Sequence, residues 1–399
     1  MKKYLILLLV LFLVGCGKSA TKMKDLSLLN KSEIDAYAKE NNLSVTYKDV
    51  YSTREKGSVV SQSIKEGTKI SKNDELIIEI SLGRLTDEEY KKKEVNELGR
   101  VPVMMYHGIH NKKSSETAYT GGNVDKDGYQ RTAEAFRKDL EFYYESGYRM
   151  IRLEDYINGK IDVELGYSPI IITFDDGLEN NIKVTGLDKD GNIIIDPNSA
   201  IGVLEEFKKK HPDANVTATF FVTGDIFNQE EYNEKILKWL VNNGYDVGNH
   251  TWTHVNFKNA SIETTQKEVG SVYELLEKYI PGKYVNIVAL PYGSPGVKTH
   301  QTYPYILTGT YNGKTYHTDA CLRVGWEADY SPFSQKFDKE FIKRIRAYDN
   351  NGNDFDIEYN FKLLEDNRYI SDGNQKTIVI PSEYKEYVSN PNNLDVITY

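Results

Sequence analysis

The feature that most constrains the fold is an apolar, β-branched run, Pro169 to Phe174, that ends directly at two aspartates, Asp175 and Asp176. Such a run is typical of a buried strand, so both carboxylates are expected at a strand end. Later in the chain, His250 and His254 have the i, i+4 spacing that puts two imidazoles on one face of a helical turn. One carboxylate and two imidazoles form the ligand set of a catalytic zinc site that keeps one position open. The sequence therefore predicts a divalent-metal site beside a strand end.

Strands and helices alternate from residue 100 onward. Strands are predicted at 101–105, 148–151, 169–174, 217–222, 245–248, 284–289, 303–309, 320–324 and 376–380. Helices are predicted at 132–146, 199–210, 230–243 and 262–280. This alternation favours parallel strands covered by helices, and hence an α/β fold with an irregular (β/α) barrel. In such barrels the catalytic groups collect where the strands end.

The N-terminus has the pattern of an export signal. Lys2 and Lys3 precede an apolar run from Tyr4 to Val14, which is shorter than the roughly 20 residues of a membrane span. We therefore predict a signal peptide over 1–15 rather than a transmembrane anchor. The sequence up to Cys16 resembles a bacterial lipobox, which implies acylation of Cys16 and a lipidated tether over 16–23. Lipid would then hold the protein at the outer face of the bacterial cell membrane, an extracytoplasmic location.

Residues 24–83 are predicted to form a small α+β domain with one helix followed by strands. This segment resembles a single PASTA repeat, a module that occurs on cell-wall enzymes and is associated with peptidoglycan recognition. The matching stretches are Asn42-Leu43-Ser44-Val45, Gly57 to Ser63, Glu66-Gly67-Thr68 and Ser81-Leu82-Gly83. Because a single copy can act either as a binder or as a spacer, both roles stay open. The charged segment 84–99 is predicted to be a linker.

Several short motifs that follow resemble, in sequence order, those of the polysaccharide deacetylases (NodB-homology type, carbohydrate esterase family 4). They are Val101-Pro102-Val103-Met104-Met105-Tyr106-His107, Thr173-Phe174-Asp175-Asp176-Gly177, Ala218-Thr219-Phe220-Phe221-Val222, His250-Thr251-Trp252-Thr253-His254 and Leu290-Pro291-Tyr292-Gly293. The resemblance implies a NodB-type domain over 100–399, folded as an irregular (β/α) barrel. It also implies a hydrolase that cleaves the carbon–nitrogen amide bond of an N-acetyl group.

The same resemblance assigns roles to residues. The metal ligands that it implies are Asp176, His250 and His254. A histidine pair can also serve only as a helix cap or as a hydrogen-bond partner in the core. Asp175 would stay unligated and act as general base toward metal-bound water. Tyr292, which follows Pro291, would supply a backbone N–H that stabilises the oxyanion of the tetrahedral intermediate. Zinc is the predicted metal, and cobalt, nickel or manganese would also suit these ligands.

The third motif departs from the family pattern. Ala289 stands where the family usually has an arginine that pairs with the base aspartate. Arg323, on the predicted strand 320–324, is our predicted replacement, which would hold Asp175 ionised through a charge-assisted pair. Trp326, just beyond it, is predicted to shape the pocket floor for the acetyl group.

The last motif departs as well. The matching strand, Thr377 to Ile380, is followed by Pro381 and Ser382 instead of the histidine that usually acts as general acid. His107, at the end of the first predicted barrel strand, is the candidate substitute. It could act as the acid, it could orient the base, or it could be only a hydrogen-bonded histidine at the barrel rim.

Together these predictions favour a lipid-anchored, metal-dependent deacetylase that acts on an N-acetylated cell-surface glycan. Peptidoglycan is the first choice because the PASTA-like segment lies between the tether and the barrel. Poly-N-acetylglucosamine is second, and O-acetylated wall sugars are third. The rival hypothesis is a non-catalytic glycan-binding or cell-wall-binding lipoprotein with a degenerate deacetylase site. The net charge of −9 argues against nucleic acid as a partner.

Overall fold

The computed structural model describes residues 21–399, and the chain divides after Leu85 into two compact units. The predicted signal peptide and the predicted lipidation site at Cys16 lie outside the described residues. Within residues 21–399, no helix combines the length and the apolar character that crossing a membrane requires.

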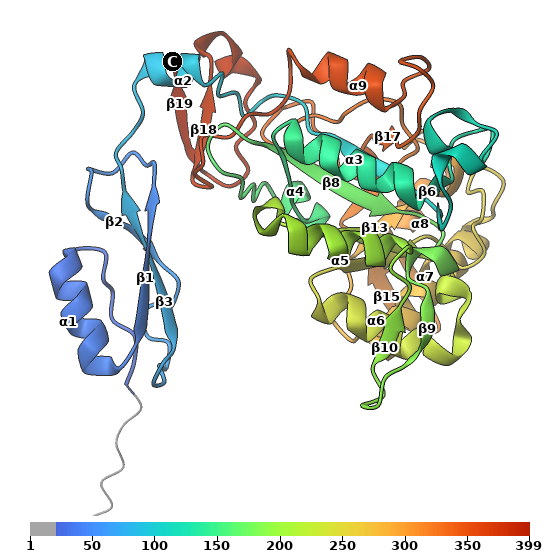
Figure 1. The fold of residues 1–399 in the computed structure, drawn as a ribbon, viewed down its shortest axis with the longest axis horizontal. Helices are drawn as coiled ribbons and strands as arrows, with labels where there is room; N and C mark the ends of the chain where they lie inside the picture. Colours follow the sequence, from blue (N-terminus) through green and yellow to red (C-terminus); the bar gives the residue numbers. More distant parts are fainter. Residues whose placement is uncertain (1–20) are drawn as a thin grey trace, which may run out of the picture. The chain divides into compact units, whose positions relative to one another are not determined.

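From residue 21 onward, the first unit consists of one helix and a three-stranded sheet with the order β1-β3-β2 (Figure 1). Its elements are α1 (Lys31–Asn41), β1 (Ser44–Val50), β2 (Val59–Gln62) and β3 (Glu75–Ser81). A capping box begins α1, because the Asn30 side chain accepts from the Glu33 N–H and the Glu33 carboxylate accepts from the Asn30 N–H. Ile34 packs with Leu76 and Ile78 of β3 in a small buried core.

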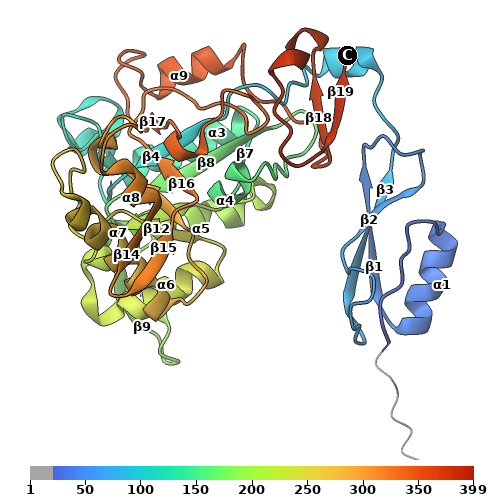
Figure 2. The ribbon, with the colours of Figure 1, turned by 180° about the vertical axis from the view of Figure 1, so that it is seen from behind.

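The second unit is built around parallel strands that pair in the order β16-β13-β12-β11-β8-β4-β17, with β7 also paired to β8 (Figures 1 and 2). These strands are β4 (Val103–Tyr106), β7 (Tyr148–Met150), β8 (Ser168–Phe174), β11 (Thr219–Val222), β12 (Asp246–Asn249), β13 (Ile287–Ala289), β16 (Ala320–Leu322) and β17 (Ile345–Arg346). A parallel bridge from Leu322 to Ile342, just before β17, joins the two ends of the sheet. The predicted α/β class and irregular barrel are therefore confirmed.

Helices cover the outer face of this barrel (Figures 1 and 2). The long ones are α3 (Ala133–Glu145), α5 (Ala200–Lys210), α6 (Asn233–Asn242) and α7 (Ile262–Tyr279). Along β8, Ile170, Ile172 and Phe174 pack in the core that these helices share, whereas Ile171 belongs to the core of the barrel interior. Because side chains alternate along a strand, the next inward positions are Thr173 and Asp175. The sequence of β8 thus delivers a carboxylate to the interior at the strand's carboxyl end.

Smaller elements surround the barrel. They are α2 (Asp87–Lys92), α4 (Leu153–Ile157), α8 (Tyr303–Leu307), α9 (Ile357–Leu364), β5 (Ile109–His110), β6 (Arg131–Thr132), β9 (Val184–Leu187), β10 (Ile193–Ile195), β14 (Thr308–Tyr311), β15 (Lys314–His317), β18 (Thr377–Ile380) and β19 (Asp395–Thr398). The predicted strand at 303–309 is wrong, since α8 occupies most of it. Pro304 lies in the first turn of α8, where its missing N–H costs no hydrogen bond.

Candidate metal and catalytic site

Asp175 and Asp176 follow directly on β8, all of whose residues are buried. The Asp175 N–H donates to the carbonyl of Tyr106 at 2.9 Å, which ties the end of β8 to the end of β4. Asp176 has a φ of 72°, in the left-handed region. The side chains of Asp175 and Asp176 therefore leave the end of β8 in different directions, and the two carboxylates contact different partners.

The two histidines lie in a loop after β12, and the predicted helical turn is wrong. Thr251 and His254 have φ values of 64° and 56°, which a helix does not contain. Side chains take the place of helical hydrogen bonds here. The Asn249 side chain accepts from the Thr251 N–H, and the Glu268 carboxylate accepts from the Thr253 N–H. These contacts fix a loop that brings both imidazoles together without a helix.

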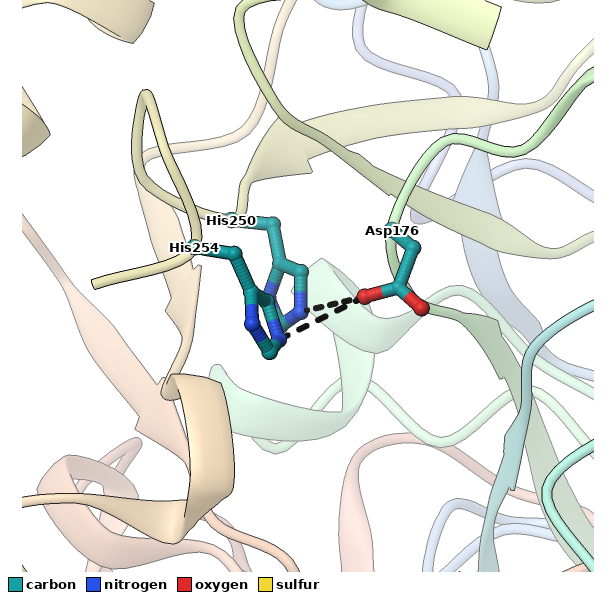
Figure 3. Close-up of side chains that lie close together, drawn as sticks. All are labelled: Asp176, His250 and His254. Atoms are coloured by element: carbon teal, nitrogen blue, oxygen red, sulfur yellow. Dashed lines mark ion pairs between the residues drawn. The ribbon is translucent and has the colours of Figure 1, made fainter. Parts of the chain in front are cut away.

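Asp176, His250 and His254 converge as the sequence predicts for a metal site (Figure 3). The Asp176 Oδ1 atom lies 3.2 Å from His250 Nε2 and 3.5 Å from His254 Nε2. His250 Nδ1 lies 2.8 Å from the Ala289 carbonyl, so that nitrogen carries the proton and Nε2 offers its lone pair. His250 Nε2 is buried and has no hydrogen-bond partner among residues 21–399. An orphaned imidazole nitrogen that faces a carboxylate and a second imidazole fits a divalent cation.

The electrostatics of this cluster also favour a cation. Burial lowers the pKa of His250, but the carboxylates of Asp175 and Asp176 overcome this effect and raise it above its ordinary value. Burial, together with the neighbouring His250, lowers the pKa of His254. The negative potential that holds a proton on His250 would equally stabilise a metal ion, which leaves both imidazoles neutral. The residues present can therefore hold a metal.

The Asp175 carboxylate pairs with a buried arginine, Arg344. Two parallel hydrogen bonds of 2.7 and 2.6 Å join the Arg344 guanidinium to the two carboxylate oxygens. Arg344 is fully buried, and it also donates to the Thr173 hydroxyl. Burial alone would raise the pKa of Asp175, but the Arg344 charge, followed by that of His250, holds it well below its ordinary range. Asp175 is thus an ionised, unligated carboxylate beside the metal site.

The predicted partner of Asp175, Arg323, does not contact it. Arg323 is half-buried, donates from Nε to the Val324 carbonyl and stacks on the Phe341 ring at 4.7 Å. Its own carbonyl accepts from Arg344 Nε, so Arg323 supports the true partner through its backbone only. The prediction missed Arg344 because Ile342 to Arg346 is too short to stand out as a strand. The available signal was the short alternation in which apolar Ile345 and Ala347 follow Arg344 and Arg346.

His107 directly follows β4, close to both aspartates, and it is half-buried. Its Nδ1 atom has no hydrogen-bond partner among the described residues, and its ring packs edge-on against Tyr129 at 5.0 Å. The Asn181 side chain donates to the His107 carbonyl and fixes the backbone. Burial lowers the pKa of His107, so its imidazole is neutral at physiological pH.

The remaining predicted site residues lie in two loops at the same end of the barrel. Tyr292 follows Pro291 in a short turn after β13, with a φ of 59° and a ring centroid 4.6 Å from that of His254. The residue is 66% exposed, which leaves its ring accessible beside the cluster of Asp176, His250 and His254. Trp326 is 52% exposed and therefore does not form a buried floor.

The strand that resembles the one before the family's last motif, Thr377 to Ile380, does not belong to the barrel sheet. β18 pairs in parallel with β19 in a separate two-stranded sheet. The last barrel strand is β17, which ends at Arg346. Pro381 and Ser382 therefore do not mark the place where a catalytic histidine would follow the barrel.

Comparison with known proteins supports both resemblances. Residues 163–304 match the family model of polysaccharide deacetylase, and residues 21–82 match that of the PASTA domain. The chain is 32% identical over 122 residues to peptidoglycan-N-acetylmuramic acid deacetylase PdaA of Bacillus subtilis, covering 31% of this chain and 37% of that protein. It is 28% identical over 124 residues to a peptidoglycan-N-acetylglucosamine deacetylase of Bacillus cereus, covering 31% and 36%. The chain spans about a third of the length of the curated relatives it matches.

Among solved structures, the Streptococcus pyogenes deacetylase PplD in complex with acetate aligns over 63% of this chain and 93% of its own, with 18% identity and a TM-score of 0.45. The family-model match covers Asp175, Asp176 and both histidines, but it ends before Arg344. The part of the barrel that carries these four residues is therefore similar to polysaccharide deacetylases, and the first unit is similar to PASTA domains.

Proposed function

We propose that this protein is a metal-dependent deacetylase that removes N-acetyl groups from a cell-surface glycan, with peptidoglycan favoured over poly-N-acetylglucosamine. One observation carries the proposal: Asp175 is kept ionised by Arg344 while it lies beside an Asp-His-His cluster. A protein that only binds glycan has no need for a buried, unligated carboxylate at that place. The similarity to peptidoglycan deacetylases supports the same function.

The residues of the chain divide the reaction as follows. Asp176, His250 and His254 would hold the cation, and zinc suits this set. A bound cation supplies Lewis acidity for the acetamide carbonyl and for water. Asp175 accepts a proton from the attacking water while the oxygen atom of that water bonds to the carbonyl carbon. The Tyr292 N–H would stabilise the resulting oxyanion.

The carbon–nitrogen bond then breaks, and the leaving amine needs a proton. Because Arg344 already fixes Asp175, His107 is not required to orient the base. We propose that the proton accepted by Asp175 reaches the leaving nitrogen through His107, whose Nδ1 has no partner among the described residues. Acetate and a free amine are the products, so the glycan gains positive charge.

The location is part of the same proposal. A signal peptide over 1–15 and lipidation of Cys16 in the tether 16–23 would place the protein on the outer face of the membrane. The PASTA-like domain over 24–83 and the linker over 84–99 would then stand between the membrane and the deacetylase domain, 100–399. Deletion of residues 24–83, followed by a peptidoglycan pull-down, would separate wall binding from a spacer role.

The first experiment measures acetate release by the soluble fragment 84–399 from peptidoglycan and from N-acetylglucosamine oligomers, with added zinc or cobalt. The matched control is Asp175→Asn, which keeps the size of the side chain and removes its charge. Metal-dependent release that is lost in the control supports the enzyme. If no acetate is released while zinc and glycan are both bound, the rival hypothesis of a binding protein with a degenerate site replaces it.

A further inference from the structure

Arg346, at the end of β17, is a cation that no carboxylate neutralises within the described part of the chain. It is half-buried, and its Nε atom is fully buried without a hydrogen-bond acceptor. The buried arginines Arg131 and Arg344 each make a paired contact with an aspartate. Burying a guanidinium without such a partner is costly. The Arg346 guanidinium can therefore still bind an anion.

Two tyrosines hold the Arg346 guanidinium in place. Its central carbon lies 4.0 Å from the ring centroid of Tyr348 and 5.1 Å from that of Tyr129. Stacking on an aromatic ring engages the flat face of a guanidinium and leaves the N–H groups at its edge for an acceptor. A preorganised cation of this kind suits a planar carboxylate, which can accept two parallel hydrogen bonds.

The neighbouring acidic side chains already have partners. Asp349 pairs with Arg131, and Asp125 accepts the backbone N–H groups of Tyr129 and Gln130. The anion must therefore come from outside the described residues.

Arg346 lies close to the proposed catalytic groups. The Tyr129 ring that contacts its guanidinium also contacts the ring of His107, at 5.0 Å. His107 Nδ1 and Asn180 Oδ1 are likewise buried without hydrogen-bond partners among the described residues. Unsatisfied buried polar atoms are rare, because each one loses its hydrogen bonds to water without gaining others. Several of them beside one reaction centre indicate a ligand that supplies the missing partners.

We propose that Arg346 binds a carboxylate of the substrate, so that the protein selects an N-acetylated sugar that carries a carboxylate near its acetamido group. This inference rests on the proposed function and narrows its substrate class. In peptidoglycan, the lactyl ether of N-acetylmuramic acid ends in such a carboxylate wherever no peptide is attached. N-acetylglucosamine has no carboxylate and leaves Arg346 unpaired.

The test compares two forms of one oligosaccharide of alternating N-acetylglucosamine and N-acetylmuramic acid: the free lactyl carboxylate and its neutral carboxamide. Calorimetric titration with the full chain gives Kd for each form, and acetate release is measured in parallel. A charge-assisted hydrogen-bonded pair predicts about 10- to 100-fold tighter binding of the carboxylate form. Arg346→Gln should reduce this ratio to about one. Arg323→Gln, which changes the other half-buried arginine at this end of the barrel, should preserve the ratio.

Each outcome bears on one hypothesis. Equal affinity for the two forms, or no measurable binding of either, overturns the role of Arg346. An equal loss of preference in Arg323→Gln also overturns it, because the preference would then reflect a general positive field. Absence of acetate release, with the preference for the carboxylate intact, overturns the proposed function and leaves the binding role of Arg346 standing.

Discussion

Replacement of Arg344 by methionine is the sharpest test of how the site is held. Methionine nearly fills the space of the arginine side chain but removes its charge. Asp175 would then be buried without a counter-charge, and breaking a buried pair from one side typically costs about 3–5 kcal/mol. Unfolding of a domain of roughly 300 residues has an entropy of about 0.6 kcal/mol per degree, so Arg344→Met should lower Tm by about 5–8 °C.

The size of this loss should depend on pH. Arg344 holds the pKa of Asp175 below its unfolded value, so the pair stabilises the fold above that value, and the stabilisation is lost as the pH falls. In Arg344→Met, burial without the arginine raises the pKa of Asp175 instead. The Tm difference between the two proteins should therefore be largest at neutral pH and shrink as the pH approaches 4.

The assay is calorimetric unfolding of the fragment 84–399 and its variants. The double variant Arg344→Met, Asp175→Asn should recover most of the lost stability, because it removes the uncompensated charge. Arg323→Met is the matched control and should change Tm by less than about 2 °C, since Arg323 is half-buried and forms no ion pair among the described residues. A single variant as stable as the unaltered fragment, or a double variant no better than the single one, would refute this account of Asp175.

Two further predictions concern other parts of the barrel. His254→Asn should weaken zinc binding, measured by equilibrium dialysis, by more than the roughly 10- to 100-fold typical of losing an outer-shell partner. His317→Asn, at an exposed hairpin histidine, should not weaken it, and equal effects would exclude His254 as a ligand. Burial raises the pKa of Asp329 to about 7, so its protonated form favours the fold, and this contribution is lost as the pH rises from 4 to 7. Between pH 4 and pH 7, the unfolding free energy of Asp329→Asn should rise relative to that of the unaltered protein by up to about 4 kcal/mol. A difference in unfolding free energy that stays constant over this range would contradict the pKa assignment.

Hydrophobic patterns that extend over many residues made the architecture predictable. The apolar runs that form β8 and β11, and the amphipathic segments that form α3 and α7, each carry enough residues to distinguish strand from helix. The segment at 303–309 misled because alternating tyrosines mimic a strand, whereas Pro304 can begin a helix. The hydrophobic pattern alone could not decide between the strand that the tyrosine alternation favours and the helix that Pro304 allows.

Within the site, a residue could be predicted only when the element or the residue that positions it lies nearby in the sequence. Asp175 and Asp176 were identifiable because the strand that positions them is adjacent in sequence. Arg344 is 169 positions away from Asp175, and the strand that begins directly after it, β17, forms only two ladder pairs with β4. Nothing local distinguishes Arg344 from Arg323, because their difference lies in the barrel: Arg323 directly follows β16, whereas Arg344 directly precedes β17.

The closure of the barrel by the segment Ile342 to Arg346 makes the reaction centre a late product of synthesis and folding. Until this segment docks between β16 and β4, the metal-site residues can be in place while Asp175 lacks its counter-charge. Contacts between such distant residues form slowly, because a long loop must close first. A chain that is cut short or only partly folded would thus keep the cluster of Asp176, His250 and His254 without an arginine to pair with Asp175. Barrel closure would then complete the site only after the chain has been synthesised beyond Arg346 and that segment has folded.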